Sequence, residues 1–222
     1  MKGWRPPERL EQWDSDMIRE RLRLGESDFT GCAFSDIVFE EMDLYGVSFS
    51  ECRFTRCRFS GAEMGMCSFV DVEMEACDLS GAAIEESFWQ RCTISNCRLV
   101  GAGFRQARLR QVRCKECAAG YVCFDQAGFD RVFLEDCDLS SAYMRACRCK
   151  ALSFARCGLL YVNFCGTMLA GVDVSTSEIG GWTLTDGAPE LRGLTVTPVQ
   201  AVELAERLGL IVAKQQGENE GL

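Results

Sequence analysis

Thiols and carboxylates are the side chains through which this sequence could do chemistry. Among its 222 residues it has 15 cysteines and 33 acidic residues, but no histidine. Without histidine the chain lacks the commonest general base and metal ligand, and it cannot form a Ser-His or Cys-His catalytic pair. Cys114 and Cys117 have the CxxC spacing of a zinc knuckle or a redox pair, but no second CxxC accompanies them. We therefore expect neither an enzyme nor a bound metal or cofactor.

Charge and hydropathy limit the partners and the compartment. Acidic residues outnumber the 24 basic ones, which gives a net charge of −9 and a pI near 4.7, so a nucleic-acid binder is not expected. The segment from Met1 to Pro7 has no apolar signal core, and no stretch approaches the ~20 apolar residues of a membrane span. These features favour the cytoplasm, where cysteines stay reduced.

The elements that must position these side chains follow from a five-residue repeat. From Phe29 to Leu184 every fifth residue is apolar, at 32 consecutive positions and without an insertion. A second series, two residues before the first, is mostly small, with 11 Cys, 7 Val and 6 Ala, and it includes Cys117. Inward positions thus alternate in steps of two and three residues. A step of two is the spacing of side chains on one side of a β-strand. The extra residue in a step of three must turn the chain.

A longer period of 20 residues indicates that four pentapeptides close into one coil. Alanines recur at 62, 82, 102 and 142, and cysteines recur every 20 residues from 57 to 157. The 32 pentapeptides then give eight coils, about 38 Å long at the ~4.8 Å spacing of neighbouring strands. Segments such as Cys77-Asp78-Leu79-Ser80-Gly81 and Cys137-Asp138-Leu139-Ser140-Ser141 resemble the pentapeptide-repeat family. That resemblance covers residues 25–187 and implies an all-β solenoid, a right-handed quadrilateral β-helix.

The flanking segments are expected to close the two ends of the solenoid. Apolar residues at near-helical spacing predict an amphipathic helix over 7–24, within an N-terminal cap of residues 1–24. Residues 188–213 form a C-terminal module: an irregular link up to Gly193, a helix over 198–208 behind a capping box at Thr197 and Gln200, and a short strand over 210–212. Residues 214–222 are expected to be a disordered tail.

The C-terminal module carries a second resemblance. Leu191-Arg192-Gly193-Leu194, followed by Gln200-Ala201 and Leu208-Gly209-Leu210, is similar to the end of the Qnr and MfpA group of pentapeptide proteins. This resemblance implies a homodimer and a DNA mimic that binds DNA gyrase and topoisomerase IV and protects them from quinolones. Several Qnr proteins have loops that interrupt the coils, whereas the register here is unbroken, as in the MfpA type. The dimer contacts are then expected at Leu194, Val202, Leu204, Ala205 and Leu208.

Outward residues sort onto four faces of the coil, which we number along the chain from the face centred on Phe29. The third face, centred on Phe39, has five acidic and two basic side chains, and the fourth, centred on Leu44, has six and two. Their combined charge of −7 over the solenoid is about a third of the charge density of B-DNA. The partner-binding carboxylates are expected at Asp43, Glu63, Asp78, Glu85, Glu86, Asp125, Asp138 and Glu178.

Other interpretations of the surface remain open at this point. An acidic solenoid needs a charged surface simply to stay in solution. The first face is net positive through Arg91, Arg108, Arg110, Arg131, Arg148 and Lys150. An outward apolar patch of Tyr121, Tyr143, Leu160 and Tyr161 predicts either packing of the C-terminal arm or a protein contact. The alternative to topoisomerase binding is therefore a scaffold or regulatory module for another partner.

Overall fold

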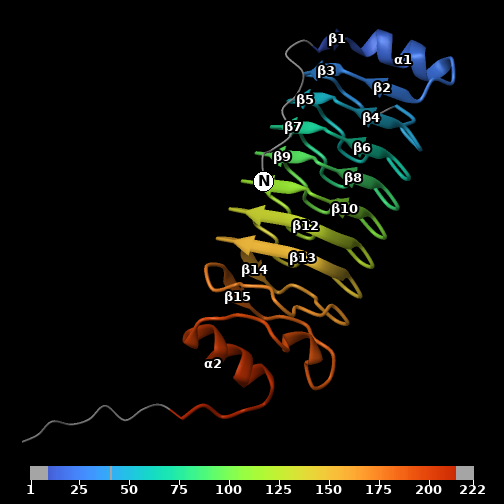
Figure 1. The fold of residues 1–222 in the computed structure, drawn as a ribbon. Coiled ribbons are helices and arrows are strands. Elements are labelled where there is room, and N and C mark those ends of the chain that lie inside the picture. The colour runs from blue at the N-terminus through green and yellow to red at the C-terminus, as the bar shows by residue number, and fades with distance from the viewer. Residues whose placement is uncertain (1–9, 41, 214–222) are drawn as a thin grey trace, which may run out of the picture.

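A computed structural model of the chain describes residues 10–40 and 42–213. It is a right-handed quadrilateral β-helix of about eight coils, stacked from the N-terminal helix α1 (Ser15–Arg23) to the C-terminal helix α2 (Pro198–Arg207) (Figure 1). Short parallel strands join each coil to the next. On the first face lie β2 (Asp28–Thr30), β4 (Ser48–Ser50), β6 (Ser68–Val70), β8 (Phe88–Gln90) and β10 (Arg108–Arg110), and on the second β3 (Cys32–Ser35), β5 (Arg53–Thr55), β7 (Glu73–Glu75), β9 (Thr93–Ser95) and β11 (Arg113–Lys115).

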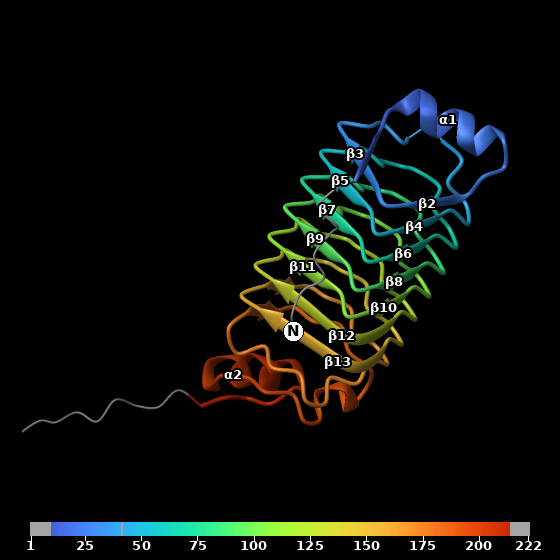
Figure 2. The same cartoon turned by 45° about the horizontal axis from the view of Figure 1, so that its top comes forward.

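Near the C-terminal end the strands lengthen and change face. Strands β12 (Gly128–Glu135) and β13 (Arg148–Ala155) each run over both the first and the second face, which joins the two into one sheet of 13 strands. The third and fourth faces are held mainly by isolated bridges, apart from β14 (Gly158–Leu160) and β15 (Glu178–Gly180) on the third face. Figure 2 shows these coils stacked in register, with α1 across the N-terminal end.

The 20-residue register predicted from the sequence is confirmed along the coils. Phe29 pairs with Phe49 and Phe49 with Phe69, so like residues stack along the axis. The rings of Phe39 and Phe59 lie 4.5 Å apart and nearly parallel. Of the 32 apolar repeat positions, all but Cys149 and Leu184 are fully buried. Each buried aromatic side chain contributes roughly 1.5–3 kcal/mol through removal from water, and the stacks add to this.

The corners also confirm the predicted turning residue. The last residue of many pentapeptides has a positive φ, near 67° at Gly61 and 56° at Glu86. Such a conformation costs roughly 1–2 kcal/mol for a residue with a side chain, and glycine avoids that cost. Cross-coil hydrogen bonds hold the corners in place, as from the Glu86 amide to the carbonyl of Arg105 at 2.9 Å.

The small inward series has a hydrogen-bonding role that its composition alone did not reveal. Thiols at these positions donate to the carbonyl oxygen 23 residues earlier, as from Cys67 to Leu44 at 2.9 Å and from Cys147 to Phe124 at 3.0 Å. The Trp182 indole makes the same contact with Leu159 at 2.6 Å. A short donor at this position therefore satisfies a buried carbonyl while filling little space, which favours Cys over a purely apolar residue.

At the N-terminal end the predicted amphipathic helix is present but shorter than residues 7–24. The described part of this segment begins with β1 (Glu11–Trp13), which pairs with β3, and only then forms α1 (Ser15–Arg23) behind the N-cap Asp14. Residues 1–9 lie outside the described residues. The exposed edge of the first coil needs a strand partner, and β1 supplies it while Trp13 packs edge-on against Phe29 at 5.5 Å. Ile18 of α1 is fully buried against the coil.

At the C-terminal end the capping box was predicted correctly, but two other features were not. Helix α2 (Pro198–Arg207) begins with reciprocal bonds between Thr197 and Gln200. The expected irregular link instead holds the 3-10 helix η1 (Pro189–Leu191) and an extra coil side in which Thr195 pairs with Asp173. Residues 210–212 form no strand, because no strand edge of the described chain lies beside them. The tail from 214 lies outside the described residues.

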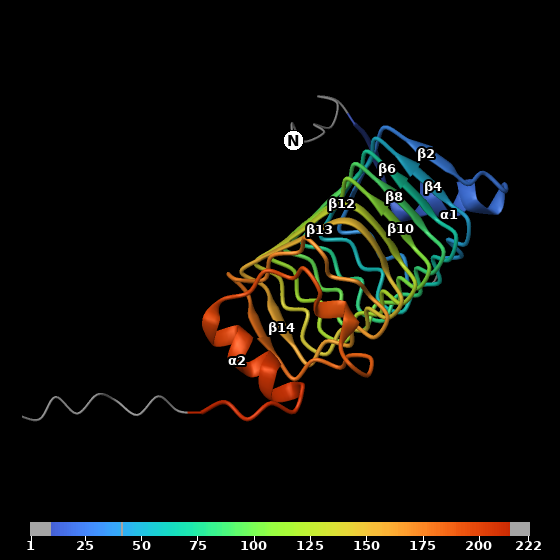
Figure 3. The same ribbon diagram turned by 60° about the horizontal axis from the view of Figure 1, so that its bottom comes forward.

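Side-chain hydrogen bonds attach α2 to the last coil, beside which it lies in Figure 3. The Gln200 amide donates to the carbonyls of Val174 and Ser177 at 3.0 and 2.8 Å, and Arg207 donates to that of Trp182 at 2.7 Å. Leu204 is buried against the core. No helix in the described part of the chain is long and apolar enough to span a bilayer.

Candidate functional site

The expected partner-binding carboxylates all face outward from the solenoid, but they differ in exposure. Asp43, Glu63, Glu85, Glu86 and Asp125 lie on the fourth face, and Asp78, Asp138 and Glu178 lie on the third. Five are exposed, Asp78 and Glu85 are half-buried, and Asp125 retains only 6% of its accessible surface. The set therefore does not form one uniform acidic surface.

Ion pairs between coils neutralise two of these carboxylates. Asp125 accepts from the backbone amide and the Nε of Arg145, each at 2.9 Å, and from a second guanidinium nitrogen. Burial opposes ionisation of Asp125, but the hydrogen bonds and charge of Arg145 outweigh it and lower the pKa of the carboxyl. Asp78 lies 3.8 Å from Arg98 and accepts from the Ser80 amide at 2.9 Å. Neither presents a free charge to a partner.

Four of the expected carboxylates keep an unpaired charge on the fourth face, and we call them the acidic cluster: Asp43, Glu63, Glu85 and Glu86. Among the described residues, no arginine or lysine nitrogen lies within ion-pair distance of any of them. They occupy the first three coils, residues 27–86, which span about 14 Å along the axis. That is one charge per ~3.6 Å, close to the 3.4 Å per charge of a single DNA strand.

Local structure holds the acidic cluster open to solvent. The Tyr45 amide donates to Asp43 at 3.2 Å and fixes this carboxylate at the corner of the first coil. The Glu85 carboxylate extends over Gly103 of the next coil, where a Cβ would lie 3.0 Å from its oxygen. Gly103 therefore leaves the space that this side chain occupies. Both carboxylates are thus positioned by residues of the coil itself.

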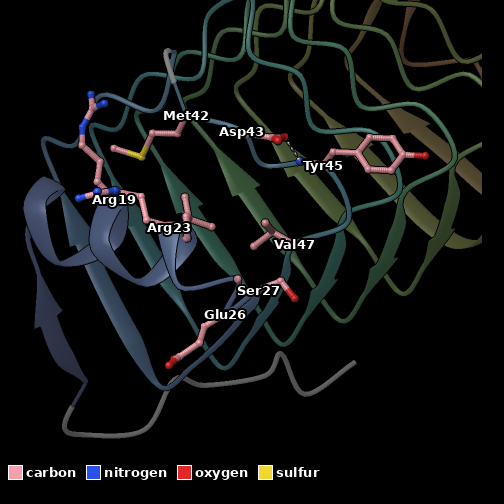
Figure 4. A pocket seen from close by; sticks show the side chains of 10 residues that line it. Arg19, Arg23, Glu26, Ser27, Met42, Asp43, Tyr45 and Val47 are labelled. Atoms are coloured by element: carbon pink, nitrogen blue, oxygen red, sulfur yellow. Dashed lines mark hydrogen bonds between the residues drawn. The ribbon is translucent and has the colours of Figure 1, made fainter.

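A pocket of about 420 Å³ adjoins the N-terminal end of the acidic cluster, between α1 and the first coil (Figure 4). Leu22, Met42 and Val47 give it an apolar floor, and Asp43 and Tyr45 stand at its rim. Arg19 and Arg23 of α1 complete the lining. The arrangement can accept an apolar side chain of a partner that contacts the acidic cluster.

The described residues of the C-terminal arm, up to residue 213, do not cover the aromatic patch. Tyr121, Tyr143 and Tyr161 remain 61%, 43% and 66% exposed, and Leu160 is half-buried. Tyr121 and Tyr161 occupy equivalent corners two coils apart with φ near 60°. This conformation belongs to the corner position itself, since Met66 and Arg91 share it, so the exposure of the tyrosines rather than their backbone favours a role in contact.

The expected dimer residues are divided between core and surface. Leu204 is buried in its own chain, Leu194 packs against the core, and Ala205 is half-buried. Only Val202 and Leu208 are exposed, at 42% and 49%. The expected dimer contacts did not include four further exposed apolar side chains of this module: Val199, Leu210, Ile211 and Val212.

Twelve of the 15 cysteines are buried in the core of the coils, and Cys123, Cys149 and Cys165 are half-buried. All 15 are unpaired, and Cys114 and Cys117 are both buried. Burial raises the pKa of the Cys92, Cys67 and Cys147 thiols to about 12, so they stay protonated at neutral pH. The described residues contain no cluster of three or more side chains that could hold a metal ion.

Cross-coil ion pairs are the main feature of the surface that sequence reasoning missed. They join residues 20 apart, as in Asp36 with Arg56, Asp78 with Arg98 and Asp136 with Arg156. Because the 20-residue period can be seen in the sequence, a comparison of charged residues 20 positions apart would have found these ion pairs. Counting charges by face concealed the pairing.

Comparisons with known proteins found one family model and several solved structures. Residues 27–104 match the family model described as pentapeptide repeat region. A trypsin-treated form of QnrB1, a plasmid-mediated fluoroquinolone resistance protein, is 20% identical over 83% of this chain and 99% of that chain, with a TM-score of 0.41. HetL, involved in heterocyst differentiation regulation in the cyanobacterium Nostoc, is 13% identical over 82% and 92%, with a TM-score of 0.42. The search of curated proteins found no match.

Proposed function

We propose that this chain, which carries a pentapeptide repeat region, is a non-enzymatic binding protein that imitates DNA toward a type II topoisomerase such as DNA gyrase. The observation that carries the proposal is the acidic cluster, whose linear charge density is close to that of one DNA strand. A protein that binds DNA presents basic side chains to the phosphates along the strand. The cluster would then contact those side chains in place of phosphates.

The acidic cluster supports mimicry better than the net charge of the faces does. Averaged over the third and fourth faces, the density is about a third of that of B-DNA. Ion pairs remove Asp78 and Asp125 from that sum. Asp138 and Glu178 stay exposed on the third face without an ion pair among the described residues, whereas the unpaired carboxylates expected on the fourth face lie in the first three coils. The proposed contact is therefore confined to the N-terminal half of the fourth face.

The homodimer belongs to the same proposal. Val199, Val202, Leu208, Leu210 and Ile211 are exposed at the C-terminal end, opposite the end that carries the acidic cluster. Pairing of two such ends would bury these side chains and place the two acidic clusters at the far ends of the dimer. The dimer would then present a longer molecule to a DNA-binding groove than one chain can.

A gyrase supercoiling assay tests the proposal. Added protein should inhibit supercoiling of relaxed plasmid, and an excess of linear DNA should compete with it for binding to gyrase. If micromolar protein leaves supercoiling unchanged and does not bind gyrase, the topoisomerase proposal fails.

The exposed aromatic patch favours a second candidate, a scaffold that binds another protein. Tyr121 and Tyr161 offer rigid contact area at one corner of the third face. If gyrase does not bind, replacing both tyrosines with serine should abolish capture of whichever partner is found. The same change should leave gyrase binding intact if the acidic cluster is the site.

A further inference from the structure

The arginines and lysines of the coils are paired with carboxylates almost throughout. Within the described residues of 27–187, all but three of these cations lie within 4.0 Å of a carboxylate oxygen. The three exceptions are Arg105, Arg108 and Arg148. They are not scattered over the surface, because all three flank the corner between the fourth and the first face.

A groove of about 800 Å³ runs along this corner. Arg108 and Arg148 line it, and Gly128 lies between them on β12, paired with Arg108 on one side and Arg148 on the other. A Cβ on Gly128 would meet nothing within 4 Å, so the glycine leaves open space between the two guanidinium groups. The two arginines occupy the same position in coils two apart, so their Cα atoms are separated by about 9.6 Å.

The remaining lining of the groove combines the polar Gln106, Gln126 and Glu86 with apolar side chains such as Met66 and Phe88. Gln106 donates to the side-chain oxygen of Gln126 at 3.0 Å, which leaves one amide oxygen and one amide nitrogen free to bind a ligand. Glu86 contributes a carboxylate at the end of the groove away from Arg148. The free amide oxygen of Gln106 and the Glu86 carboxylate disfavour a phosphodiester chain, because phosphate oxygens can only accept hydrogen bonds. A peptide offers both backbone donors and acceptors as well as acidic side chains.

We propose that this groove binds an extended peptide segment of a partner protein that carries acidic side chains three residues apart, with two of its carboxylates held by Arg108 and Arg148. In a polyproline II segment, three residues advance about 9.3 Å and return to the same side, which matches the spacing of the two arginines. Each carboxylate can then form charge-assisted hydrogen bonds with one guanidinium. The groove shares Glu86 with the acidic cluster at one end, but its proposed ligand contacts are Arg108 and Arg148, so it does not depend on the topoisomerase proposal.

Fluorescence anisotropy with a fluorescein-labelled peptide of three Asp-Pro-Pro repeats tests the groove. The unmodified protein should bind this peptide, and the double variant Arg108→Gln/Arg148→Gln should bind it at least about ten-fold more weakly. The matched control, Arg58→Gln/Arg98→Gln, removes the same charge from the exposed third face and should bind with unchanged affinity. Equal melting temperatures of the variants confirm that folding is not the cause.

Three results would overturn the proposal. One is no binding of the Asp-Pro-Pro peptide, and another is equal affinity of the two double variants. The third is tighter binding of an Asn-Pro-Pro peptide or of single-stranded oligothymidylate, because the groove would then recognise prolines or phosphates rather than spaced carboxylates.

Discussion

At the scale of single residues, the solenoid depends on positions that recur every five and every 20 residues. An inward side chain meets its own neighbours and its equivalents one coil above and below. Phe54, for example, is fully buried, stacks on Phe34 at 4.8 Å and meets Phe49 edge-on at 5.2 Å. A substitution at such a position therefore acts on several coils at once.

Phe54→Asp tests this dependence. It buries an unpaired charge among aromatic rings and should destabilise the protein by more than about 4 kcal/mol, enough to unfold the neighbouring coils. Urea unfolding followed by circular dichroism measures the change. Thr55→Asp on the outward side of the same strand is the control and should change stability by less than about 1 kcal/mol. A Phe54→Asp protein that melts cooperatively like the parent would contradict the register.

The Asp125–Arg145 pair gives a pH-dependent prediction. The pKa of Asp125 is lowered in the folded protein, so its contribution to stability is present above the ordinary value of 3.8 and is lost as the pH falls through the folded value. Asp125→Asn should cost about 1–3 kcal/mol at pH 7 and progressively less below pH 4. Thermal melts of both proteins between pH 7 and 3 measure this convergence. A stability difference that grows on acidification would contradict the assigned ion pair.

At the scale of elements, the two caps close the solenoid by different means. Strand β1 extends the second face by backbone pairing before α1 covers the first coil. Helix α2 is instead attached by side chains, above all by Gln200, which caps the helix and also donates to two carbonyls of the last coil. The buried Glu190 supports the same end by accepting from the Gly166 amide at 2.8 Å and from Thr185. The C-terminal cap should therefore depend strongly on single polar residues.

Substitutions at Leu204 in α2 and at Leu208, its C-cap, test dimer formation and the stability of the single chain separately. Leu208→Glu should convert a dimer to a monomer in light scattering while leaving the β signal intact, because Leu208 is 49% exposed. Leu204→Glu should instead lower the melting temperature, because it places a charge in the core of its own chain. A monomeric parent protein, or loss of fold in the Leu208→Glu variant, would contradict this division.

At the scale of the whole molecule, the coil architecture could be predicted from the sequence because each coil repeats one local pattern. The series of apolar residues at every fifth position is unbroken from Phe29 to Leu184, so only one register of the coils buries all of them. The ends were predicted less well, since Leu10 and Trp13 fit a helix or a strand and only the open edge of the first coil decides between them. The candidate site was located by face but not in detail, because pairs such as Asp125 with Arg145 form between coils rather than along the chain.

The central claim is that the position of the acidic cluster, and not the total charge, determines topoisomerase binding. The most direct measurement compares the affinity of gyrase for two quadruple variants of equal charge. One is Asp43→Asn/Glu63→Gln/Glu85→Gln/Glu86→Gln. The other is Asp28→Asn/Glu51→Gln/Glu75→Gln/Asp173→Asn, whose carboxylates lie on the first and second faces and, among the described residues, have no ion-pair partner.

The first variant should bind gyrase about ten-fold or more weakly than the parent, because up to four charge contacts are lost. The second should bind like the parent. Affinity of the parent should also fall as salt rises above 0.1 M, where exposed charges are screened over ~10 Å. Equal affinity of the two variants, or affinity that does not change with salt, would contradict the account.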